Sequence, residues 1–248
     1  MVLSSLENAK PQSLHPMISN GKLSTLAMIA WQCVVLSGGV AQGQDAQRGP
    51  FGFIRLLNAV SIGTGKLEFF IDGKSVRPDG YQLGNITGGI ALKPSTYKVE
   101  FRRDGVKDGE TRVIVAANDT TILIPFAEQL PVSEGQPGRW EIWILRLKQH
   151  AAEDQRTATF VSVSREPELK VEIRQSDGKW HPVLVKRLGI ARADIRQARG
   201  YLSVRCKQQE LSAVSVGAAG NFVSVLYEDE NGILRSKTFQ DYKYLSTD

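Results

Sequence analysis

A cluster of basic side chains in the C-terminal third carries the strongest chemical signal in the sequence. Between positions 186 and 207 seven residues are basic and only Asp194 is acidic, which gives this window a formal charge of +6. Guanidinium groups bind carboxylates and phosphates through paired hydrogen bonds, and lysines add point charges. The window predicts a surface for an anionic partner, or alternatively a solvated strand face that keeps the protein soluble. The seven residues are Lys186, Arg187, Arg192, Arg196, Arg199, Arg205 and Lys207.

Residue types that support catalysis or metal binding are scarce. His150 and His181 are the histidines that follow position 43, and neither has Cys, His or Asp at the spacing of metal ligands. The chain contains no Gly-x-Ser-x-Gly, no His-Glu-x-x-His and no phosphate-binding glycine-rich loop after a strand. We therefore expect a protein that is not an enzyme, has no metal or cofactor, and acts by binding.

Aromatic residues narrow the class of partner. Tyr201 is the one aromatic residue inside the basic window, whereas nucleic-acid sites interleave aromatic and basic side chains. We therefore expect no nucleic-acid partner. Trp140 and Trp143 are predicted to share one face of a strand, where they either stack on sugar rings or pack in the core or at a domain interface.

The N-terminal segment has the pattern of an export signal. The apolar stretch 23–35 is followed by Gly38-Gly39 and a run of small residues, with cleavage expected after Ala41 or Gly43. This stretch is shorter than the roughly 20 apolar residues that a membrane span needs. We expect residues 1–43 to be a cleaved signal peptide that starts at Met1 or Met17, and no stable membrane span after cleavage.

The composition of the remaining chain indicates its compartment. Residues 44–248 contain 29 basic and 25 acidic residues and a single cysteine, Cys206, so no internal disulfide can form. An exported protein without disulfides is typical of a bacterial periplasm or cell surface rather than a eukaryotic secretory route. With 42% hydrophobic and 23% charged residues, the chain has the composition of a globular protein.

The rest of the chain reads as short β-strands. Runs of five to eight residues rich in Val, Ile, Tyr, Phe and Thr recur about every ten residues, and Asp-Gly or Asn-Gly pairs supply hairpin turns. Segment 190–199 has some helix-forming residues but no wide apolar stripe. The predicted strands are 53–60, 66–71, 86–92, 96–102, 111–116, 121–125, 140–147, 157–164, 169–174, 183–186, 200–207, 211–216, 221–227 and 233–239.

The two halves of the predicted strand region resemble each other. Segments 67–74 and 171–179 are similar in kind, as are 115–123 and 216–225, and the offset stays between 102 and 105 residues. About seven short strands per half is the count of an immunoglobulin-like sandwich. We predict an all-β protein with two tandem antiparallel immunoglobulin-like β-sandwich domains. The predicted boundaries are 1–43 for the signal peptide, 44–149 for the first domain, 150–156 for the linker and 157–248 for the second domain.

Three segments of the first half resemble a group of exported bacterial sandwich domains of uncharacterised function. They are Gly52-Phe-Ile-Arg-Leu-Leu-Asn-Ala59, Ile71-Asp-Gly-Lys74 and Leu92-Lys-Pro-Ser-Thr-Tyr-Lys-Val99, although Pro94 is displaced by one position and no Gly precedes Thr96. The two-unit arrangement after a signal peptide also resembles the periplasmic alginate O-acetylation accessory proteins of the AlgF type. This resemblance implies a non-catalytic adaptor that holds acetyl-transfer enzymes near an anionic exopolysaccharide.

The leading hypothesis is an exported cell-envelope adaptor that assists modification or export of an anionic exopolysaccharide such as alginate. Arg192, Arg196, Arg199 and Arg205 would be its main contacts with the polymer or with the acidic face of an envelope protein. The alternative is a structural surface or matrix protein that assembles through exposed edge strands. Added salt distinguishes the two, because ionic association weakens with ionic strength and strand pairing does not.

Overall fold

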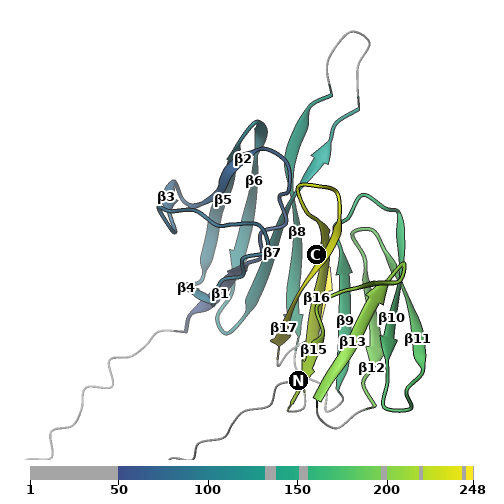
Figure 1. Ribbon diagram of the computed structural model, residues 1–248. Coiled ribbons are helices and arrows are strands. Elements are labelled where there is room, and N and C mark those ends of the chain that lie inside the picture. Colours follow the sequence, from purple (N-terminus) through teal and green to yellow (C-terminus); the bar gives the residue numbers. More distant parts are fainter. Residues whose placement is uncertain are drawn as a thin grey trace, which may run out of the picture. The chain divides into compact units, whose positions relative to one another are not determined.

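The computed structural model describes residues 50–131, 138–150, 156–196, 200–217, 220–241 and 244–247 (Figure 1). The predicted signal peptide and positions 151–155 of the predicted linker lie outside these residues. Every regular element in the described part is a β-strand, which confirms the all-β prediction. Within the same ranges, no helix has the length and apolarity that crossing a membrane requires.

Each strand predicted from the sequence overlaps a strand of the structure. Segment 190–199, for which a helix was the alternative, begins with a strand that pairs with a neighbour over five residues. The first half contains β1 (Gly52–Leu56), β2 (Thr64–Ile71), β3 (Lys74–Ser75), β4 (Ile90–Leu92), β5 (Ser95–Asp104), β6 (Val106–Val115), β7 (Thr120–Gln129) and β8 (Trp140–His150). The second half contains β9 (Thr157–Ser162), β10 (Glu168–Arg174), β11 (Trp180–Lys186), β12 (Ile190–Asp194), β13 (Gly200–Cys206), β14 (Gln209–Glu210), β15 (Val214–Val216), β16 (Asn221–Glu228), β17 (Leu234–Asp241) and β18 (Tyr244–Thr247).

The strands of each half pair in two rows. In the first half these rows are β3-β2-β5-β6 and β8-β7-β1-β4, and a single residue pair, Lys107 with Glu141, joins them. In the second half they are β11-β10-β13, with β14 and β15 beside β13, and β12-β9-β16-β17. Strand β18 pairs with β8, so the last described strand of the second half joins a sheet of the first half.

Strand order and direction repeat between the halves, in agreement with the constant offset in the sequence. Strand β1 pairs antiparallel with β4 and parallel with β7, and β9 pairs in the same way with β12 and β16. The prediction of purely antiparallel sheets is therefore wrong. Between β1 and β7 the chain passes through the other row of strands, and such a crossover returns it in the same direction.

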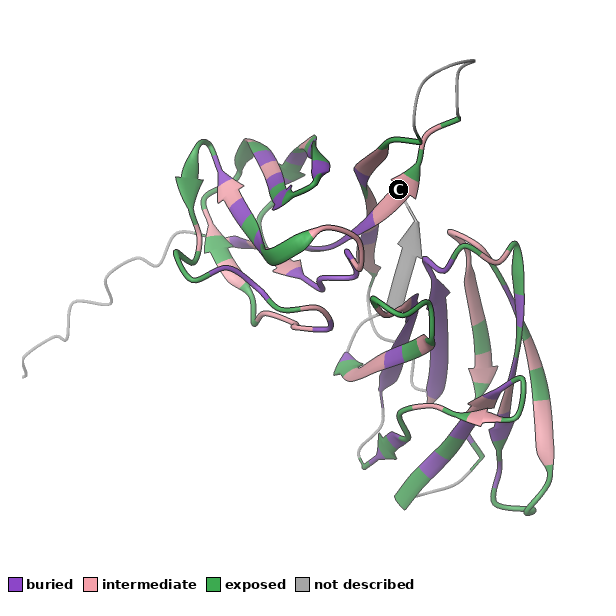
Figure 2. Cartoon of the chain, turned by 45° about the horizontal axis from the view of Figure 1, so that its top comes forward, coloured by how far each residue is buried: buried purple, intermediate pink, exposed green. Residues whose placement is uncertain are grey.

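Each half encloses an apolar cluster between its two rows of strands. In the first half Leu67, Phe69 and Phe101 are fully buried in this cluster, and in the second half Phe160 and Phe222 are. Because successive side chains of a strand point to opposite faces, alternate residues enter the cluster. Figure 2 shows the resulting alternation of buried and exposed residues along the outer strands. The described strands thus have a sandwich-like arrangement.

A third apolar cluster joins the two halves. Strands β7, β9 and β16 have nearly continuous buried runs, because one face packs inside its own half and the other packs against the other half. The third cluster contains Leu57, Ala59, Ile122, Ile124, Phe126 and Leu147 of the first half and Val161, Val163, Val223, Val225 and Tyr227 of the second. The halves therefore share a buried apolar interface.

Arginine–carboxylate pairs also link the halves. The side chain of Arg103 donates to Glu230 at 3.0 Å, and Arg55 lies 3.3 Å from Asp241. Arg187 pairs with Glu128. Together with β18, these contacts tie the first-half sheets to the second half.

Candidate functional site

The outer face of the β11-β10-β13 sheet collects basic and aromatic side chains. Leu169, Val171 and Ile173 of β10 enter the second-half core, so Lys170, Glu172 and Arg174 lie on the opposite face. The same alternation places side chains of the neighbouring strands β11 and β13 on that face. We call this surface the basic–aromatic face, and it is defined by Lys170, Arg174, Trp180, Lys186, Tyr201 and Arg205.

An arginine of β13 stacks across β10 on a tryptophan of the edge strand β11. The guanidinium carbon of Arg205 lies 4.0 Å from the centroid of the Trp180 ring. Nε of Arg205 donates to Oε2 of Glu172 at 2.7 Å, and the two residues are direct cross-strand neighbours. Cation–π contacts at exposed sites contribute about 0.5–1 kcal/mol. The two contacts hold the Arg205 side chain beside the partly exposed indole.

Three further cations lie on the same face, Arg174 beside this stack and Lys170 and Lys186 farther along β10 and β11. Arg174 is the cross-strand neighbour of Trp180, and Lys170 is that of Leu184. The described part of the chain offers no ion-pair partner to Lys170, Arg174 or Lys186; Arg174 donates instead to the carbonyl of Gly178 at 3.2 Å. These cations are not held in ion pairs, although the exposed Glu168 is the cross-strand neighbour of Lys186.

Large apolar groups are exposed on the same sheet face. Tyr201 is 76% exposed and Leu184 is 58% exposed. Exposed aromatic and apolar groups that gather beside charged ones are typical of binding surfaces. The sequence analysis missed Lys170 and Arg174, which precede the basic window, and Trp180, which lies between the predicted strands 169–174 and 183–186. The alternation of polar and apolar residues along 168–174 is the signal that could have found the first two.

The structure places three of the seven predicted basic residues on this sheet. Lys186 and Arg205 belong to the basic–aromatic face, and Lys207 follows β13 directly. Lys207 forms an ion pair with Glu166, and this hydrogen bond raises the pKa of its ammonium group.

The other predicted basic residues lie elsewhere. Arg187 pairs with Glu128 of the first half and donates to the carbonyl of Ser164 at 2.9 Å. Arg192 is exposed on β12, which belongs to the other sheet of the second half, and the exposed Arg196 follows this strand. Arg199 lies outside the described residues. The chain between positions 186 and 207 crosses from one sheet to the other and back, so it does not gather these residues on one surface.

The edge of this sheet is poorly suited to adding another strand. Strand β11 is the edge strand, and the backbone N–H of Gln175 donates to the carbonyl of Lys179 at the hairpin end. Hydrogen-bonded and non-hydrogen-bonded residue pairs alternate along an antiparallel ladder. The backbone of Pro182 therefore faces away from β10, on the side where an added strand would pair. Proline has no N–H, so the donor in the middle of this edge is missing.

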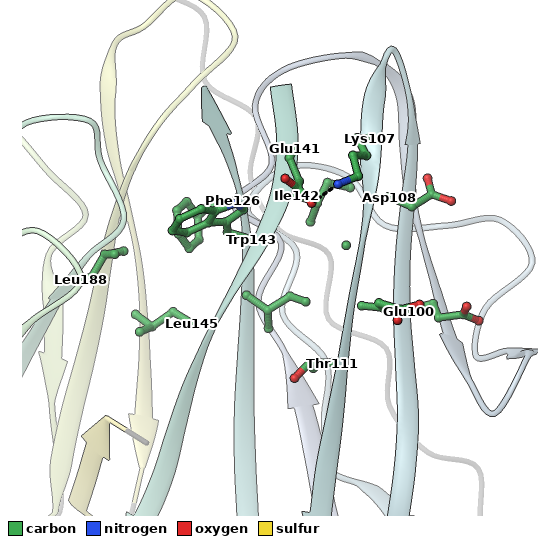
Figure 3. Close-up of a pocket in the computed structure, with 13 residues that line it drawn as sticks. Glu100, Lys107, Asp108, Thr111, Phe126, Glu141, Ile142, Trp143, Leu145 and Leu188 are labelled. Carbon is green, nitrogen blue, oxygen red and sulfur yellow. Dashed lines mark hydrogen bonds and ion pairs between the residues drawn. The ribbon is translucent and has the colours of Figure 1, made fainter. Parts of the chain in front are cut away.

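A hollow of about 670 Å³ lies beside β6 and β8 (Figure 3). The two strands pair at Lys107 and Glu141, and Gly109 allows their close approach, since a Cβ there would lie 2.3 Å from the carbonyl oxygen of Ile142. Within the described residues no group of three or more His, Cys, Asp or Glu side chains could hold a metal ion. We call this hollow the β6–β8 groove, and its lining includes Glu100, Asp108, Glu110, Phe126, Glu141, Trp143 and Leu145.

The two tryptophans of β8 lie on opposite faces of the strand. Trp140 packs against the first-half core, while Trp143 is 45% exposed and lines the groove. The prediction that they share a face is wrong, because a separation of three residues reverses the direction of a strand side chain. Trp143 alone is therefore open to a ligand.

Comparisons with known proteins give little information on this chain. No protein-family model and no curated protein sequence matches it. Among solved structures, it is similar to a carbohydrate-binding module of family CBM26 from Eubacterium rectale Amy13K, solved in complex with maltoheptaose. That similarity has a TM-score of 0.22 and 8% identity and covers 77% of this chain and 97% of the module, which is too weak to support a conclusion about fold or ligand.

Proposed function

We propose that this protein is a non-catalytic binding component of the bacterial cell envelope that holds an anionic polysaccharide on its basic–aromatic face. The observation that carries the proposal is the Arg205–Trp180 stack on a face that also presents Arg174 beside it and Lys170 and Lys186 farther along the strands. The last three cations have no ion-pair partner among the described residues. A pyranose ring presents an apolar C–H face to an aromatic ring. The carboxylates of an acidic sugar pair with guanidinium and ammonium groups.

The layout of the face favours a polymer over a small anion. Trp180 and Tyr201 lie on strands that are two positions apart in the sheet, which corresponds to a separation of about 10 Å across the strands. Arg174 lies on the strand between them, and Lys170 and Lys186 lie farther along β10 and β11. An extended chain of acidic sugars can therefore contact both aromatic rings and several cations at once, whereas a single small anion reaches one or two of these groups.

The cellular role is part of the same proposal. The signal-peptide pattern of residues 1–43 supports export to the periplasm or cell surface, and the resemblance to alginate O-acetylation accessory proteins supports a role beside acetyl-transfer enzymes or export machinery. In this role the protein would hold the polymer while another protein modifies or moves it. We also propose that the halves are tandem immunoglobulin-like sandwiches, which the repeated strand pairing supports.

Changing the basic–aromatic face is expected to weaken binding to alginate. The triple variant Lys170→Ser, Arg174→Ser, Lys186→Ser should bind at least about tenfold more weakly in co-sedimentation, since each exposed ionic contact contributes about 0.5–1 kcal/mol. Trp180→Ala should weaken binding to a similar extent through loss of stacking. Binding of the unchanged protein should also fall steeply as NaCl is raised.

The matched control removes three charges elsewhere on the molecule. The variant Lys93→Ser, Arg192→Ser, Arg196→Ser changes exposed basic residues outside the basic–aromatic face and has the same net charge as the test variant. It should retain alginate affinity within about twofold. Equal losses in both variants would show that net charge alone attracts the polymer and would refute the proposed site.

A further inference from the structure

The β6–β8 groove has a floor and a wall of different chemistry. Phe126 is buried at the floor, beside the half-exposed Trp143 and the partly buried Leu145. Figure 3 shows these three side chains on one side of the groove and Glu100 and Asp108 on the other. A ligand in the groove therefore contacts apolar surface along one side and carboxylates along the other.

Each carboxylate of the groove wall has a cationic partner. Lys98 lies 2.8 Å from Glu100 and 3.0 Å from Glu110, and Arg102 lies 3.5 Å from Asp108. Where β6 meets β8, Lys107 pairs with Glu141 at 2.7 Å. The hydrogen bond from Lys98 holds the pKa of Glu100 below its usual value, so this carboxyl stays ionised at neutral pH. Charges in the wall are thus largely compensated.

This compensation favours an uncharged ligand. An anion would be repelled by four carboxylates, and a cation would have to displace Lys98, Arg102 or Lys107 from an existing pair. An ionised carboxylate has about four acceptor positions, and the pairs described above occupy one or two of them. The remaining positions accept hydrogen bonds from hydroxyl groups without breaking an ion pair.

We infer that the β6–β8 groove is a second binding site, and that it takes an uncharged oligosaccharide whose pyranose ring stacks on Trp143 while its hydroxyls donate to the carboxylate wall. A pyranose has an apolar face and a rim of hydroxyl donors, which matches the two sides of the groove. The volume of 670 Å³ lies in the range of about 300–1,000 Å³ that is usual for ligand pockets. The site shares no residue with the basic–aromatic face and differs from it in taking an uncharged ligand.

Titration of the full-length protein with neutral hexasaccharides tests the inference. Cellohexaose, maltohexaose and mannohexaose are used as probes, with calorimetry and tryptophan fluorescence as readouts. At least one should bind saturably below about 10 mM and change the tryptophan emission. Trp143→Ala should weaken this binding at least about tenfold through loss of stacking.

Three control measurements locate the binding. Trp180→Ala, on the basic–aromatic face, and Ile114→Ala, on a residue of β6 that is 71% exposed and outside the groove, should leave the affinity unchanged within about twofold. Glu110→Gln keeps the shape of an exposed wall residue and should weaken binding measurably, which provides a test if Trp143→Ala folds poorly. An alginate hexamer should not compete with the neutral probe.

The results that would overturn the inference differ from those that would refute the anionic site. Failure of all three probes to bind, unchanged affinity in folded Trp143→Ala, or competition by alginate would each refute a neutral-sugar site in the groove. None of these results depends on whether the basic–aromatic face binds alginate. The two proposals can therefore fail separately.

Discussion

Val225→Asp is expected to unfold both halves of the protein together. Val225 is fully buried in the apolar cluster that the halves share, and β16, which carries it, is buried on both faces. A carboxylate at this position would lose its hydration among apolar side chains from both halves, and pairing with its cross-strand neighbour Lys237 would require that partly buried ammonium group to lose its hydration as well. Unpaired buried charges cost about 3–5 kcal/mol or more, which is comparable with the total stability of many domains.

Hydrogen exchange measured by mass spectrometry during a urea titration checks this result. Peptides from β5 and β7 in the first half and from β10 and β16 in the second should lose protection at the same, lowered urea concentration. Ile114→Asp, at an exposed position, should change the free energy of unfolding by less than about 0.5 kcal/mol. Loss of protection in the second half alone would contradict the shared interface.

Arg103→Ala is expected to destabilise the protein by about 3 kcal/mol. The Arg103 side chain is almost fully buried; it donates to the carbonyls of Val60 and Gly63 and pairs with Glu230 at 3.0 Å. Removing it leaves both carbonyls without this donor and opens a cavity beside β5. Each buried polar group that loses its partner costs about 1–3 kcal/mol.

Comparison with Glu230→Gln separates the ion pair of Arg103 from its hydrogen bonds to the two carbonyls. Glu230 is 64% exposed and its amide replacement still accepts a hydrogen bond, so this variant should cost less than about 1 kcal/mol in urea unfolding. Arg103→Lys should fall between the two variants, because an ammonium group cannot reach both carbonyls and Glu230 in the same geometry. If Glu230→Gln lowered the free energy of unfolding as much as Arg103→Ala does, the ion pair rather than the carbonyl hydrogen bonds would account for the contribution of Arg103.

Strand positions and the repeat could be predicted from the sequence because they depend on local patterns. β-branched and aromatic runs between turn residues indicate strands whatever their partners are. Parallel pairing of β1 with β7 depends instead on the path of the chain between them, which leaves no local pattern. The shared interface left one visible sign, the continuous apolar run Ile122-Leu-Ile-Pro-Phe126, which lacks the alternation of a strand with one exposed face.

The candidate site could be predicted only in part, because neighbours in a sheet are distant in the sequence. Arg205 and Lys186 lie in the basic window, but Arg174 and Trp180 join them through strand pairing. The carboxylates that pair with Arg187, Arg205 and Lys207 come from positions 128, 172 and 166, so the acid-poor window overstates the free positive charge of its residues.

Backbone amide NMR of the protein titrated with an alginate hexamer tests the central claim most directly. If the basic–aromatic face holds the polymer, chemical shifts should change at 168–174, 180–186 and 201–206 and remain constant at 190–194 and 141–145. Shift changes confined to β12 or the groove, or none at all at low salt, would contradict the account.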